Sequence, residues 1–147
     1  MAFSLSKLFN KTNSEALSND SIEAIIRDVK NKPFGTSENN VLFAGLNELG
    51  GYYFFQTIIV GALSLKSKTG ASLLFKGENF ELKLKSDMPE FESESSDIKG
   101  RNVTKIDFQI EERDISLLEK AQLSSITIKV KKQDILFTKY HSSEEEE

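Results

Sequence analysis

The stretch Thr104-Lys-Ile-Asp-Phe-Gln-Ile110 places an apolar side chain at every second position. The same alternation recurs in Phe80-Glu-Leu-Lys-Leu-Lys85 and in Ile126-Thr-Ile-Lys-Val130. Because successive side chains of a β-strand point to opposite faces, each stretch has one apolar face and one polar face. This pattern predicts an antiparallel sheet that packs one face on a core and exposes the other to water.

The alternation also predicts the burial of individual side chains. The apolar set should lie in the core: Ile106, Phe108, Ile126, Ile128, Phe80 and Leu82. The set that alternates with it should be exposed: Lys105, Asp107, Thr127, Lys129, Glu81 and Lys83. A register shift of one residue would exchange the two sets, so their burial is a direct test of the strand assignment.

Further strands are expected on both sides of these stretches. Tyr52–Val60 is aromatic and β-branched, as strands are, and is apolar on both faces. We therefore expect an inner strand that is covered on both sides. Leu73–Phe75 and Ile135–Tyr140 add two more strands, and a short helix capped by Asp114 should precede Ile126.

The N-terminal part has a helical pattern instead. Asp20-Ser-Ile-Glu23 resembles a capping box, and the apolar residues that follow recur at helical spacing until Pro33 ends the helix. A second helix is predicted over Glu38–Leu49, where Leu42 and Leu46 would share a face and Gly50-Gly51 would stop it. The residues from Phe3 to Phe9 suggest a short amphipathic turn.

Together these patterns predict a single α+β domain over residues 1–141, helical over 1–50 and β-rich over 51–141. The N-terminal helices would pack on a mainly antiparallel sheet of about six strands, which either stays open or curls into a partial barrel or sandwich. Residues 142–147 are Ser-Ser followed by four glutamates, and such a block of like charge predicts a disordered acidic tail.

The composition excludes several kinds of chemistry. The 147 residues carry 23 acidic and 19 basic side chains, one histidine and no cysteine. Disulfides, thiolate metal sites, cysteine nucleophiles and multi-histidine sites are therefore absent from the chain. The net charge of −4 argues against nucleic acid as a partner, and the glycines fit no phosphate-binding loop. We expect no cofactor and no metal.

The apolar stretches do not predict a membrane protein. The most apolar part, Val41–Leu65, is interrupted by polar residues and glycines, whereas a helical span needs about 20 mostly apolar residues. The first ten residues lack the continuous apolar region of a secretory signal. We expect no membrane span and a cytoplasmic location.

Four polar features of the sequence are candidate sites. His141 has no neighbour in sequence that would orient it as a catalytic base, and we interpret it as solvated. Acidic loop 87–97 is interpreted as solvated, with cation binding left open. The lysines of the last hairpin are interpreted as protection of a sheet edge rather than as a nucleic-acid site. Four carboxylates cluster after the strand that ends at Ile110: Asp107, Glu111, Glu112 and Asp114.

These observations leave three hypotheses for function. The favoured one is a non-enzymatic binding or assembly module whose partner is another protein or a second copy of the chain. The alternative is a domain that binds a small apolar ligand in a cavity lined by Tyr52, Tyr53, Phe54, Phe55 and Phe80. A hydrolase that uses only carboxylates is the third hypothesis.

Overall fold

The structure is a computed structural model that describes residues 21–29 and 31–141. The predicted turn around Phe3–Phe9 and the predicted acidic tail 142–147 lie outside these residues. The elements in chain order are α2 (Ile22–Asp28), β1 (Gly35–Thr36), β2 (Asn40–Leu49), β3 (Tyr52–Gly61), β4 (Lys66–Ser67), β5 (Ser72–Gly77), β6 (Phe80–Lys85), β7 (Phe91–Glu92), β8 (Glu94–Ser95), β9 (Asn102–Ile110), α3 (Glu112–Lys120), β10 (Leu123–Val130) and β11 (Gln133–Lys139).

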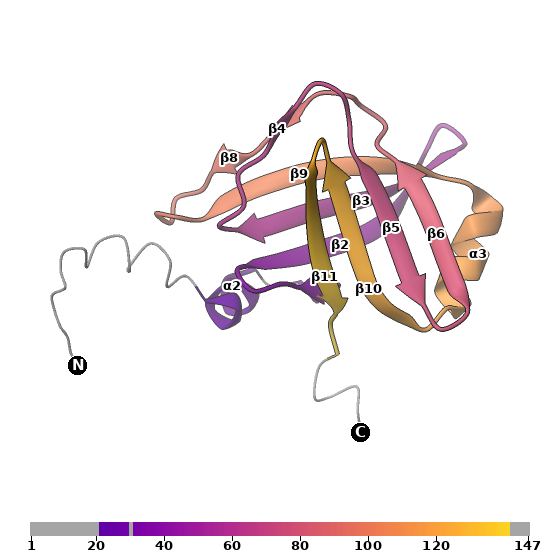
Figure 1. The fold of residues 1–147 in the computed structure, drawn as a ribbon, viewed down its shortest axis with the longest axis horizontal. Coiled ribbons are helices and arrows are strands. Elements are labelled where there is room, and N and C mark those ends of the chain that lie inside the picture. The colour runs from indigo at the N-terminus through magenta and orange to yellow at the C-terminus, as the bar shows by residue number, and fades with distance from the viewer. Residues whose placement is uncertain (1–20, 30, 142–147) are drawn as a thin grey trace, which may run out of the picture.

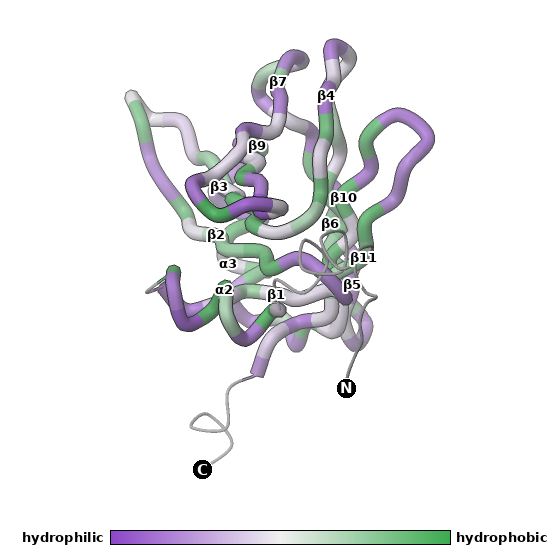
Figure 2. The backbone as a smooth tube through the Cα atoms, turned by 90° about the vertical axis from the view of Figure 1, so that its left-hand side faces the viewer, coloured by the Kyte–Doolittle hydropathy of each residue, from purple (hydrophilic) through white to green (hydrophobic). Residues whose placement is uncertain are grey.

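One antiparallel sheet of nine strands forms most of the molecule, in the order β6-β5-β10-β11-β1-β2-β3-β9-β8. The sheet curls into a half-barrel, so that β5, β10 and β11 cross in front of β2 and β3 (Figure 1). Seen from the side, the two groups of strands lie opposite each other (Figure 2). Strands β4 and β7 form a separate two-stranded ribbon.

The predicted fold class is wrong in its balance of helix and strand. Helices were expected to fill residues 1–50 and to cover a sheet of about six strands. The described residues instead form a nine-stranded sheet and two short helices, α2 and α3. The curl of the sheet buries its apolar face against itself, so it does not need a layer of helices to form a core. The alternative of a partly closed barrel is the one that the structure resembles.

The largest error concerns the helix predicted over Glu38–Leu49. Residues Asn40–Leu49 form β2, which pairs with β3 over ten consecutive residue pairs without a bulge. The turn between the two strands is Gly50-Gly51, with φ angles of 61° and 88°. Two residues with positive φ form the tight turn that matches the twist of a hairpin, so the glycines join two strands instead of ending a helix.

Two narrow joints hold the curled sheet together. Strand β1 is two residues long and connects β11 to β2 through Gly35 and Thr36. On the other side, the end of β6 meets β9 at a single bridge between Ser86 and Phe108. The Asp87 amide donates to the Asp107 carbonyl at 2.8 Å beside this bridge. Elsewhere along β6 and β9 the two strands diverge.

Aromatic side chains fill the interior of the half-barrel. Phe34, Phe55 and Phe75 form a cluster of edge-to-face rings, with centroids 5.1–6.4 Å apart. Phe108 and Phe137 are fully buried in the same core. These residues come from different parts of the curled sheet, so their contacts hold its two halves together.

The predicted alternation of buried and exposed residues is confirmed for the later strands. Ile106, Phe108, Ile126 and Ile128 are buried, whereas Phe80 and Leu82 near the end of the sheet are half-buried. Of the residues that alternate with them, Thr127 is half-buried. The charged ones are all exposed: Lys105, Asp107, Lys129, Glu81 and Lys83.

Strand β3 lies between β2 and β9, as expected of an inner strand. Only one end of its outer face is covered. Helix α2 packs Ile25 there, against Val41, Phe43 and Val60. Gln56 and Ile58, on the same outer face, are exposed. The prediction that both faces are covered along the whole strand is therefore wrong, because α2 is too short to span it.

Each of the two helices has a local anchor. Ser21 caps α2 by accepting from the Ala24 amide at 3.1 Å, and Asp28 near its end pairs with the buried Arg101 at 3.2 Å. Helix α3 buries Leu118 against the core. Its N-cap position is Glu111, whereas Asp114, the predicted cap, lies in the first turn.

Candidate functional site

The structure brings together three of the five aromatic residues predicted to bind a ligand. Tyr52, Tyr53 and Phe54 line a groove of about 520 Å³ at the surface. Phe55 instead lies in the core and is 3% exposed. Phe80 lies at the β5–β6 turn and lines a different groove. Phe55 and Phe80 therefore do not share a cavity with the other three.

The groove lies where β6 and β9 diverge beyond the Ser86–Phe108 bridge, and we call it the seam groove. One side consists of Lys83, Leu84 and Lys85 of β6. The other side and the base come from β3, β9 and the start of α3: Tyr52, Tyr53, Phe54, Gln109, Ile110, Glu111 and Asp114. The lining thus combines basic, acidic and aromatic side chains, a composition that suits a partner with both apolar and polar atoms.

Acidic residues determine the electrostatics near Tyr53. The carboxylates of Glu112 and, to a lesser extent, Glu48 raise the pKa of the Tyr53 phenol, with a small contribution from burial. A nearby negative charge disfavours the phenolate, so Tyr53 keeps its proton and can donate a hydrogen bond. The guanidinium of Arg113 pairs with Glu111 at 3.1 Å at the start of α3.

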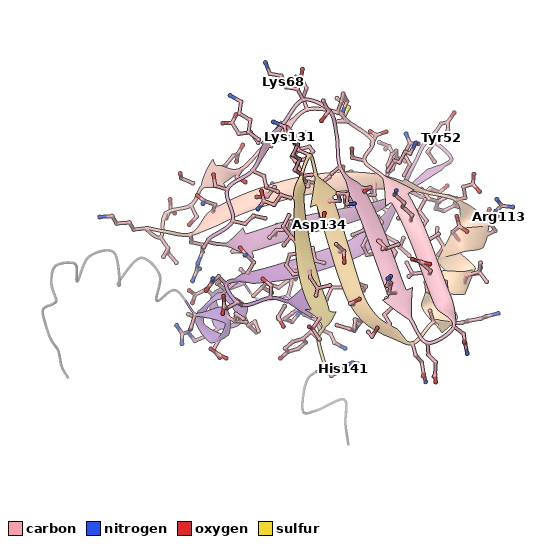
Figure 3. All side chains as sticks on the ribbon, viewed as in Figure 1. Tyr52, Lys68, Arg113, Lys131, Asp134 and His141 are labelled. Carbon is pink, nitrogen blue, oxygen red and sulfur yellow. The ribbon has the colours of Figure 1, made fainter. Side chains whose placement is uncertain are left out.

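A second feature adjoins the seam groove at the tip of the β2–β3 hairpin. Leu46, Leu49 and Tyr52 are 43%, 69% and 73% exposed. The hairpin tip is the purple loop at the upper right of Figure 1, and Tyr52 projects outward there, on the same side of the molecule as Arg113 (Figure 3). Leu49 and Tyr52 pair across the turn and share one face, whereas Leu46 pairs with Phe55 on the other face. Exposed large apolar side chains are typical of contact surfaces.

The hairpin tip also has an unpaired backbone edge. Strand β2 pairs with β1 only at Val41 and Leu42, although it pairs with β3 as far as Leu49. Within the described residues no strand pairs with the outer side of β2 beyond Leu42. We call Ala44–Glu48 the free edge of β2. The sequence-based prediction of a helix over Glu38–Leu49 missed this strand and its free edge. Gly50-Gly51 between two apolar runs is a recognised hairpin signal and could have indicated the strand.

The other candidate groups are dispersed. Asp107 faces solvent in a separate groove with Met88 and Lys105, away from Glu111 and Asp114. His141 is exposed just after β11, at the end of the strand that is far from Lys131 (Figure 3). Among the described residues, no three histidine, aspartate or glutamate side chains lie close enough to hold a metal ion.

The lysines of the last hairpin lie near those of β6. Lys129 and Lys131 line a shallow groove together with Lys83 and Lys85. The carboxylate of Asp87, which accepts from Gln109 Nε2 at 2.8 Å, lies in the same groove.

Comparison of the chain with protein-family models, with curated proteins and with solved structures finds no match. In the part of the chain that the structure describes, no helix is long and apolar enough to cross a membrane.

Proposed function

We propose that the protein is a non-enzymatic binding module that recognises another protein chain through the tip of the β2–β3 hairpin. One observation carries this proposal: Leu49 and Tyr52 on one face of the hairpin and Leu46 on the other are exposed beside a backbone edge that has no neighbour strand among the described residues. A free edge supplies main-chain hydrogen bonds to an added strand, and the apolar side chains beside it supply contact area.

The location and the class of partner belong to the same proposal. The partner is a protein rather than a nucleic acid, because the residues around the hairpin tip, 44–54, include no basic side chain and the net charge is −4. We place this interaction in the cytoplasm.

The seam groove supports a second candidate function, the binding of a small amphipathic ligand. Tyr52, Tyr53 and Phe54 provide aromatic surface, and Lys83 and Lys85 provide cationic groups for an acidic end of the ligand. This function predicts saturable chemical-shift changes at Tyr53 and Lys85 with a small aromatic carboxylate. Such changes should disappear in Lys85→Glu.

The test of the main proposal compares matched aspartate variants in affinity capture from the native lysate. Leu49→Asp places a charge on the hairpin tip, whereas Leu136→Asp changes a leucine that is 59% exposed on the outer face of β11. Both substitutions affect exposed positions, so both variants should fold. Proteins captured by the wild type should be lost with Leu49→Asp and retained with Leu136→Asp. Equal capture by the two variants would contradict the proposal.

A further inference from the structure

The free edge of β2 carries few of the devices that normally prevent strands from pairing between molecules. Protected edges are usually short, carry charged side chains or proline, or are interrupted by a bulge. Ala44–Glu48 is Ala-Gly-Leu-Asn-Glu, with a single charge at its end and without lysine or proline, and the register of β2 is continuous. By contrast, β8 at one end of the sheet is two residues long, and β6 at the other carries Glu81, Lys83 and Lys85.

The backbone groups that point outward can be assigned from the hydrogen bonds of β1. The carbonyls of Asn40 and Leu42 accept from the amides of Ser37 and Phe34, which lie on the β1 side. Peptide groups alternate in direction along a strand, and β2 has no bulge. The amides and carbonyls of Ala44, Leu46 and Glu48 therefore point away from β3, into the space beyond β1.

These three residues are spaced symmetrically about Leu46. When two copies of the edge run antiparallel with a two-fold axis at Leu46, Leu46 faces Leu46 and Ala44 faces Glu48. All the facing residues then have outward amides and carbonyls, and each facing pair exchanges two hydrogen bonds, which gives about six in all. A two-fold axis at Gly45 would place half of the pairing on residues that β1 already occupies.

Charge does not oppose this arrangement. Glu48 faces Ala44 of the other copy, so no two charged side chains face each other. The two Glu48 side chains are four residues apart along the paired strands, about 13 Å at 3.3 Å per residue. This separation exceeds the Debye length of about 8 Å at physiological ionic strength, so their repulsion is screened. The half-exposed Leu46 side chains meet at the axis and cover each other.

We infer that the occupant of the free edge is a second copy of this chain, joined as a symmetric dimer through antiparallel pairing of Ala44–Glu48 about Leu46. The dimer continues the curled sheet of one copy into that of the other. This inference rests on the proposed function, since it gives the hairpin surface its partner.

The register allows a direct test, because the chain has no cysteine. Facing residues of a hydrogen-bonded antiparallel pair have Cα atoms about 5.5 Å apart, within the range that a disulfide spans. Leu46→Cys in the full chain should therefore form a covalent dimer under mild oxidation. Leu49→Cys should not, because its two copies lie six residues apart, about 20 Å along the strands. Leu136→Cys on β11 controls for random collision.

Analytical ultracentrifugation of the wild type over a concentration series provides the second measurement. A dimer in the wild type, a monomer in Leu46→Lys and selective cross-linking of Leu46→Cys would support the inference. A wild type that stays monomeric, with Leu46→Cys linking no faster than Leu136→Cys, would overturn it. If other proteins are still lost with Leu49→Asp in that case, the proposed function stands and the inference alone fails. If the dimer forms but capture is equal for Leu49→Asp and Leu136→Asp, the proposed function fails and the inference stands.

Discussion

Replacing Phe55 by alanine should strongly destabilise the protein, because the structure places this residue in the core. Its side chain is 3% exposed and contacts Phe34 and Phe75 in edge-to-face geometry, at 5.5 Å and 5.1 Å between ring centroids. Burial of such a side chain contributes about 1.5–3 kcal/mol, and each aromatic pair adds about 0.5–1.5 kcal/mol. We therefore expect the free energy of unfolding to fall by about 3–5 kcal/mol.

Urea unfolding at equilibrium, followed by far-UV circular dichroism, measures this change. Tyr52→Ala is the matched control, because Tyr52 is on the same strand and is 73% exposed. Its effect should be within about 0.5 kcal/mol. A loss of less than about 1 kcal/mol for Phe55→Ala would refute the core assignment. The sequence-based ligand hypothesis would then regain Phe55 as a site residue.

Three further outcomes are expected. Gly77→Ala should cost about 1–3 kcal/mol, because its Cβ would overlap the backbone between α3 and β10, whereas Gly45→Ala, with open space, should change urea stability by less than about 1 kcal/mol. Glu112→Gln should lower the pKa of Tyr53 in a spectrophotometric titration, and an unchanged value would contradict the charge assignment. The stabilisation linked to the protonated Tyr53 phenol is complete below its ordinary pKa of 10.0 and is lost as the pH rises through the raised value. Asp28→Asn should accelerate amide exchange in α2 relative to the strands, and unchanged protection would show that this ion pair does not anchor the helix.

The later strands could be predicted from sequence because their pattern admits one period. Phe80–Lys85 was predicted with the same bounds as β6, and Ile106 and Phe108 alternate with charged residues that no helix would place so regularly. Over Asn40–Leu49 the pattern fits both a helix and a strand. Leu42, Leu46 and Leu49 match a helical face, yet Val41–Ala44 is a continuous apolar run, which is also typical of a buried strand. Hairpin pairing with β3 decides between them, because cross-strand packing overrides the weak helical preference of the segment.

The candidate site was predictable only in part, for a related reason. Tyr52–Phe54 were selected as an aromatic run, and they do line a groove. The sequence did not indicate that Lys83 and Lys85 lie across from them, because that proximity depends on how far the sheet curls before Ser86 meets Phe108. The curl also determines that Phe55 faces an interior filled by Phe34 and Phe75.

The sequence separation of the paired strands has a consequence for how quickly the chain folds. The β2–β3 hairpin needs only the two-residue Gly50-Gly51 turn and can form early. Other pairings of the sheet close much longer loops: Thr57 of β3 donates to the Ile106 carbonyl of β9, 49 residues away, and Ser124 of β10 donates to the Lys76 carbonyl of β5, 48 residues away. Non-local strands must lose the entropy of closing a long loop before their pairing contributes any stability. We therefore expect folding on a millisecond-to-second scale, with the hairpin formed in the transition state. During that interval the outer side of β2 beyond Leu42 has no partner strand among the described residues, so crowded refolding should favour aggregation through this strand.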